Sequence, residues 1–125
     1  MILDTNAVSA IADGDPDVES VVGVATVIAL PVITLGEYRF GIRQSRNRAK
    51  YEKWLDALIR SCHVLDVDGE TTVRYAEIRS ELRGTGRPIP GNDVWIAALA
   101  RQHALPVLSR DRHFDSVPGL RRISW

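Results

Sequence analysis

Met1-Ile2-Leu3-Asp4-Thr5-Asn6 is the stretch that decides the fold, because a short apolar strand here runs straight into a helix start. Asp and Asn suit such a start, since their side-chain oxygens accept hydrogen bonds from the free N–H groups of the first turn. The pattern predicts a helix over residues 6–13 that stops at Gly14. Asp15-Pro16 then begins a second helix, with proline where its missing N–H does no harm.

Short apolar runs and helical patterns alternate along the rest of the chain. Further strands are expected at 27–33 (with Pro31 an awkward member), 62–67, 106–108 and, very short, 121–124. Helical patterns cover the region from Thr34 through an apolar stripe at 51–59, then 70–83, which Gly84 and Gly86 end, and the apolar segment 94–100. This alternation predicts an α/β fold, a three-layer sandwich around a mainly parallel sheet of four to five strands.

Length and composition bound the function. The 125 residues suit one domain, 1–125, and the single cysteine excludes a disulfide framework and a cysteine-built zinc site. No apolar run approaches a membrane span, so we expect a cytoplasmic protein with no membrane contact. The net charge is zero, but residues 1–38 hold six acids and no base, whereas 39–53 hold six bases and one acid. That basic stretch is either a solvated helix face or a phosphate-binding surface.

Four acids follow strands or open helices: Asp4, Glu37, Asp93 and Asp111. Ligand sites of open parallel sheets lie beyond the carboxyl ends of the strands, where these positions can converge. Each acid also has a simpler structural explanation. Asp4 and Asp93 can be helix caps, Thr34 to Glu37 has the spacing of a capping box, and Asp111 can close a turn. Capping alone, however, does not require an acid at all four places.

Convergence of these carboxylates would need a counter-charge. Two carboxylates about 4 Å apart repel by roughly 4 kcal/mol at an effective dielectric constant near 20. A helix N-terminus offsets about 1 kcal/mol of this, so a raised pKa or a bound cation must absorb the rest. Oxygen ligands favour Mg²⁺ or Mn²⁺. The histidines show no metal-ligand spacing, and we interpret them as core or surface residues: His63, His103 and His113.

The ordered set of motifs resembles the PIN domain, and within it the VapC-type toxins of bacterial and archaeal toxin–antitoxin pairs. The motifs are Asp4-Thr5-Asn6, Glu37 after Ile33-Thr34, Gly91-Asn92-Asp93 before Ile96-Ala97-Ala98, and Ser109 to Phe114. The resemblance runs from Met1 to Trp125. It implies a Mg²⁺- or Mn²⁺-dependent endoribonuclease, usually a homodimer, that a cognate antitoxin holds inactive. Operator DNA would be reached only through the antitoxin.

Carried over residue by residue, the resemblance assigns the family's acidic quartet to Asp4, Glu37, Asp93 and Asp111. In our hypothesis Asp4, Asp93 and Asp111 hold the main ion, while Glu37 positions a second ion or the attacking water. Hydrogen bonds that fix the carboxylates are expected from Thr5, Asn6 and Ser109, the last replacing a more usual threonine. Asp115 stays outside this set.

Arginines near the acids are candidates for RNA contacts: Arg39, Arg43, Arg46, Arg110 and Arg112. The alternative is that they pair with acids of neighbouring helices or of the antitoxin. The stripe at 51–59 is expected to be core, with a dimer or antitoxin surface as the alternative.

Three other functions compete with a nuclease. A receiver-type domain would need an acidic pair near the first strand and a late lysine, and an aspartate-nucleophile phosphatase would need an acid where Asn6 stands. The more serious alternative is a catalytically silent PIN-like interaction module, whose usual mark, loss of an acid, is missing here.

Overall fold

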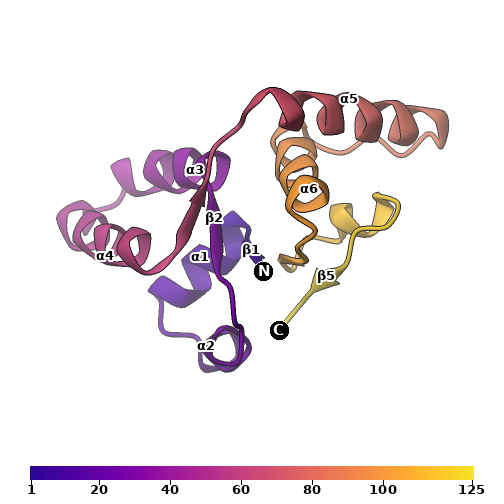
Figure 1. Ribbon diagram of the computed structural model, residues 1–125. Helices are drawn as coiled ribbons and strands as arrows, with labels where there is room; N and C mark the ends of the chain where they lie inside the picture. Colours follow the sequence, from indigo (N-terminus) through magenta and orange to yellow (C-terminus); the bar gives the residue numbers. More distant parts are fainter.

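A five-stranded, all-parallel sheet forms the centre of the computed structural model, which describes all residues 1–125. The strands stand in the order β3-β2-β1-β4-β5. Their bounds are β1 Ile2–Leu3, β2 Ala29–Pro31, β3 His63–Leu65, β4 Val107–Leu108 and β5 Arg122–Ile123. Helices cover both faces, which confirms the predicted three-layer α/β sandwich (Figure 1). No helix combines the length and apolar character that crossing a membrane requires.

The alternation of strand side chains divides the core in two. Ile2, Ala29 and Val107 point to one face, whereas their neighbours Leu3, Leu30 and Leu108 point to the other, and all six are fully buried. The strands have only two or three residues each, so in β1, β2 and β4 one pair of neighbours supplies both faces.

The Leu3 face of the sheet is covered by four helices, α1 Thr5–Ala12, α2 Pro16–Gly23, α3 Val32–Arg43 and α4 Arg48–Ser61. Asp4 and Asp15 cap α1 and α2 as predicted, and Gly14 leaves α1 with a φ of +72°. The stripe at 51–59 is core: Leu55 is fully buried, and the other members pack around it against this face.

The Ile2 face is covered by α5 Gly69–Gly84, α6 Gly91–His103 and a short 3₁₀ helix at Arg112–Ser116. Helix α6 is enclosed as its apolar sequence predicts, with every residue from Ile96 to Ala100 buried. It therefore carries Asp93, in its first turn, on a rigid support.

The structure differs from the local sequence patterns at three places. The strand expected at 27–33 ends at Pro31, because α3 begins at Val32. The helical region after it is two helices, separated by residues 44–47. The capping box is absent too: Thr34 donates its hydroxyl to the carbonyl of Leu3 at 2.9 Å, which ties α3 to β1 and places Glu37 in the second turn.

Candidate active site

All four acids lie at the edge of the sheet where the carboxyl ends of the strands are found. Asp4 directly follows β1, Asp111 follows β4 by three residues, and α3 and α6 bring Glu37 and Asp93. Glu37, Asp93 and Asp111 line a hollow of about 500 Å³ together with Pro90, Gly91 and Asn92, so that Pro90 contributes the only apolar side chain. The hollow therefore offers carboxylate oxygens from three separate elements.

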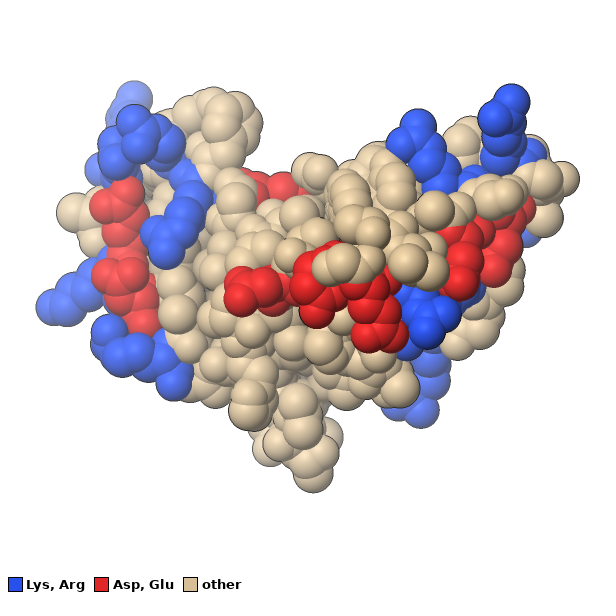
Figure 2. Space-filling model, turned by 45° about the horizontal axis from the view of Figure 1, so that its top comes forward, with Lys and Arg blue, Asp and Glu red and all other residues tan.

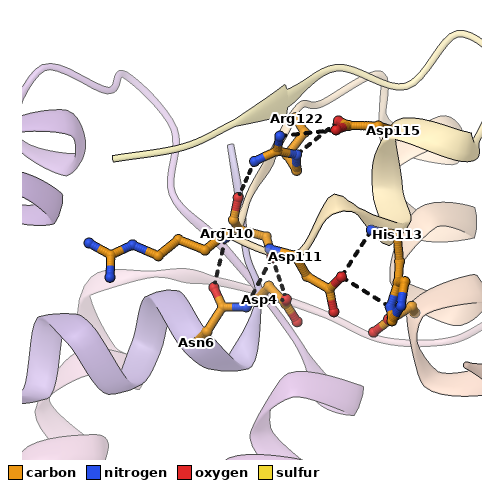
Figure 3. Close-up of polar contacts among 9 residues, drawn as sticks. Asp4, Asn6, Arg110, Asp111, His113, Asp115 and Arg122 are labelled. Atoms are coloured by element: carbon orange, nitrogen blue, oxygen red, sulfur yellow. Dashed lines mark hydrogen bonds and ion pairs between the residues drawn. The ribbon is translucent and has the colours of Figure 1, made fainter.

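The Ser109 hydroxyl joins Asp4 to the Asp111 loop. It donates to Asp4 Oδ2 at 2.7 Å and accepts from the Asp111 N–H at 2.9 Å. Asn6 Nδ2 lies 3.1 Å from both Asp4 Oδ2 and Ser109 Oγ, and its Oδ1 accepts from the Arg110 N–H (Figure 3). With the Thr5 N–H on its other oxygen at 2.8 Å, the Asp4 carboxylate is fixed on both sides.

Thr5 fixes the side chain of Glu37. The Thr5 hydroxyl donates to Glu37 Oε1 at 3.1 Å, so the residue after Asp4 positions the next acid. The three polar residues expected to orient carboxylates, Thr5, Asn6 and Ser109, all make such hydrogen bonds.

His113 is exposed, as expected of a surface residue, but it also lies within the acidic cluster, which the sequence did not indicate. Its Nδ1 is 3.1 Å from Asp93 Oδ2 and 3.0 Å from Asp111 Oδ1 (Figure 3). The ligand atoms of these three residues lie within 4.8 Å of one another. One local signal could have found part of this arrangement. Asp111 caps the 3₁₀ helix by accepting from the His113 N–H, and this turn brings the His113 side chain back toward Asp111.

Burial raises the pKa of two of the four acids. Desolvation is the main cause for Asp93, and the charges of Asp4 and Asp111 add to it, so that its pKa rises to about 6 despite the hydrogen bond with His113. Desolvation also raises the pKa of Asp4, against the hydrogen bonds from Ser109, Thr5 and Asn6. The site thus has an excess of negative charge that a cation would relieve.

A divalent metal ion fits this donor set. Carboxylate oxygens suit Mg²⁺ and Mn²⁺, and an imidazole suits Mn²⁺ better than Mg²⁺. The spacings of His113 Nδ1 from the two carboxylate oxygens, 3.1 and 3.0 Å, are hydrogen-bond distances, so the imidazole holds Asp93 and Asp111 side by side.

The candidate RNA contacts fall into two groups. Arg110 points away from the candidate active site, as Figure 3 shows. Its guanidinium lies 4.6 Å from the centre of the Trp125 ring and forms an ion pair with Asp15 at 3.6 Å. The others are exposed and form no ion pair: Arg39, Arg43, Arg46 and Arg112. Figure 2, seen from nearer the carboxyl ends of the strands, shows Lys and Arg gathered toward both ends of the molecule, with acids among them as well as across the middle.

Asp115 lies outside the cluster, as expected, and supports the loop. Arg122 in β5 binds both Asp115 oxygens, at 2.8 and 3.0 Å, and donates to the carbonyl of Ser109 at 3.1 Å. This contact fixes the segment that carries Ser109 and Asp111 against the edge of the sheet.

Known proteins share both the sequence and the fold. The PIN domain family model matches residues 1–120. Ribonuclease VapC5 of Mycobacterium tuberculosis is 34% identical over 95 residues, covering 74% of this chain and 70% of the relative. The tRNA(fMet)-specific endonuclease VapC of Shigella flexneri is 31% identical over 94 residues, covering 74% and 71%.

The same relationship holds in three dimensions. The structure of VapBC2 from Rickettsia felis, bound to a DNA fragment from its promoter, matches with a TM-score of 0.89 and 26% identity, covering 99% of this chain and 97% of that one. With a family match over almost the whole length and relatives above 30% identity, the chain belongs to the PIN-domain family and, within it, to the VapC-type ribonuclease toxins of toxin–antitoxin pairs.

Proposed function

We propose that this endoribonuclease cleaves RNA with Mg²⁺ or Mn²⁺ held by Asp4, Asp93 and Asp111. The observation that carries the proposal is the convergence of Glu37, Asp93 and Asp111 around one hollow, where Asp93 has a pKa of about 6. Ser109 joins Asp4 to the Asp111 backbone beside it. A bound divalent ion would supply Lewis acidity, which makes water a better nucleophile and neutralises charge on the phosphoryl oxygens.

The residues of the chain divide the remaining work. Ser109 and Asn6 hold the Asp4 carboxylate in one orientation. Asp4 would therefore lose little side-chain entropy on binding the ion. Glu37, fixed by Thr5, lines the same hollow as Asp93 and Asp111 and would orient the attacking water or a second ion. Asp93 and Asp111 present their oxygens from α6 and the 3₁₀ cap.

The test is RNA cleavage by the wild type, Asp4→Asn and Asp93→Asn, with Mg²⁺, with Mn²⁺ and with EDTA. We expect activity with either ion, none with EDTA, and a loss of at least about a hundredfold in each folded variant. Asp17→Asn, on exposed α2, is the matched control and should cleave as the wild type does. Undiminished cleavage by Asp4→Asn or Asp93→Asn would end the proposal, and metal-independent activity would contradict the role of the ion.

The partners follow from the relatives, whose solved structures include toxin–antitoxin complexes bound to DNA. We propose that a cognate antitoxin inhibits this chain, that the active form is a homodimer, and that operator DNA is bound only through the antitoxin. Light scattering of the chain alone, and with the product of a neighbouring short reading frame, measures both assemblies. A monomer, or an antitoxin that leaves cleavage unaffected, would contradict the corresponding part.

A further inference from the structure

A second hollow adjoins the acidic one. It has a volume of about 530 Å³ and lies between the C-terminal half of α5, the following turn and the start of α6. Leu82 and Val94, both almost fully buried, are among its lining residues, and Arg79 and Arg83 line it from α5. Gly91 lines both hollows, so an extended polymeric ligand bound at the acidic site can continue into this one.

The arginines of this region differ in their partners. Arg74 and Arg101 are bound to the glutamates of α5: Arg74 to Glu70 and Glu77, and Arg101 to Glu81 at 3.0 Å. Arg79 and Arg83 are exposed and form no ion pair, and nor does Arg87 in the turn that follows. The cations that face the second hollow are therefore the ones without an acidic partner.

Arg79 is also held in place. It donates to the Tyr75 hydroxyl, and its guanidinium carbon lies 5.8 Å from the centre of the Tyr75 ring. Tyr75 in turn stacks on Trp95 of α6, with ring centres 3.9 Å apart. A guanidinium fixed in this way loses less side-chain entropy when it binds a phosphate, to which its planar fork can donate two hydrogen bonds.

We propose that this hollow, with Arg79 and Arg83, binds the RNA backbone next to the cleaved bond. The inference rests on the proposed function and adds to it a path for the substrate on the α5 side of the acids, distinct from the α3 arginines. RNA fits the surface because each phosphate carries one negative charge, and because the surface leads directly to the acids where cleavage is proposed.

The test compares the binding of a short, fluorescein-labelled oligouridine by the wild type and by R79Q/R83Q, in EDTA, which prevents cleavage. We expect the dissociation constant to rise by about tenfold or more, and the slope of its logarithm against log salt to fall by about 1.4, since two phosphate contacts are lost. R79K/R83K should keep most of the affinity, because the charges remain. R60Q is the control, since Arg60 is exposed on α4, which covers the Leu3 face of the sheet, whereas α5 and α6 cover the other face.

Equal RNA affinity of R79Q/R83Q and the wild type would overturn the inference. So would a variant that binds RNA normally but loses affinity for the antitoxin, because the hollow would then belong to the protein partner. The failure of the proposed function is a separate result: it appears as wild type that does not cleave RNA with Mg²⁺ or Mn²⁺, whatever the arginine variants bind.

Discussion

Ionised Asp93 lowers the free energy of unfolding, because its carboxylate is desolvated and lies near other negative charges. Its side chain is 12% exposed and its pKa is about 6, well above the value near 3.8 of a free aspartate. The folded protein therefore holds this proton to higher pH than the unfolded chain does. The free energy of unfolding of the ion-free protein should fall as the pH rises from about 4 to about 6, and it stays lowered above that range.

Replacing Asp93 by asparagine should remove that destabilisation. In EDTA near pH 8, Asp93→Asn should unfold with a free energy about 1–3 kcal/mol higher than that of the wild type, while near pH 4 the two should be similar. Urea denaturation at both pH values measures this difference. The exposed control Asp17→Asn should show no such gain, and a wild type that is the more stable protein near pH 8 would contradict the assigned origin of the pKa.

His113 should influence which ion the site prefers. An imidazole nitrogen binds Mn²⁺ better than Mg²⁺, and here it stands 3.0 and 3.1 Å from two carboxylate oxygens. His113→Asn should weaken Mn²⁺ binding by about tenfold while changing Mg²⁺ binding much less. Isothermal titration with each ion measures the ratio, and His103→Asn, an exposed residue at the end of α6, is the control. Equal losses for both ions would show that His113 only stabilises the carboxylates.

Among the elements, α4 depends on a single fully buried side chain. Leu55 has no exposed surface, whereas the other members of the 51–59 stripe are partly buried. Leu55→Ala should lower the free energy of unfolding by about 2–5 kcal/mol through lost burial and the cavity left behind. Lys53→Ala, exposed on the same helix, should change it by less than about 0.5 kcal/mol. A small effect of Leu55→Ala in urea denaturation would mean that α4 is not part of the folding unit.

Elements with a strong local signal were predictable. The stretch 70–83 differs from the observed α5 by one residue at each end, and Asp15-Pro16 begins α2 as expected. Elements whose limits depend on distant partners were not. Thr34 and Glu37 have the spacing of a capping box, yet the Thr34 hydroxyl donates to the carbonyl of Leu3 instead. The helix α3 begins two residues earlier, at Val32.

The same distinction holds for the site. Asp4, Glu37 and Asp111 can be selected because each follows a strand, and Asp93 because it opens an apolar helix. His113 was missed because its contact with Asp93 joins α6 to the loop after β4, a pairing that no local pattern encodes. Arg110 was chosen for its place beside Asp111, whereas its side chain lies over Trp125.

At the scale of the whole molecule, the charges are ordered although their sum is zero. On the face in Figure 2, acids run across the middle and also lie among the Lys and Arg that gather toward both ends. Arg48 of α4 and Arg74 of α5 each pair with a glutamate of their own helix. Net charge alone conceals this pattern.

The hydrogen bond from Ser109 to Asp4 joins residues 105 positions apart in the chain. During synthesis, Asp4 leaves the ribosome long before Ser109 and Asp111 are added, and β4, which pairs with β1, arrives with them. A growing polypeptide therefore cannot bring the four acids together until Ser109 and Asp111 have been added. The topology itself delays activity, so the messenger and the ribosome that make this enzyme are safe from each nascent copy until β4 and the segment that follows it have emerged.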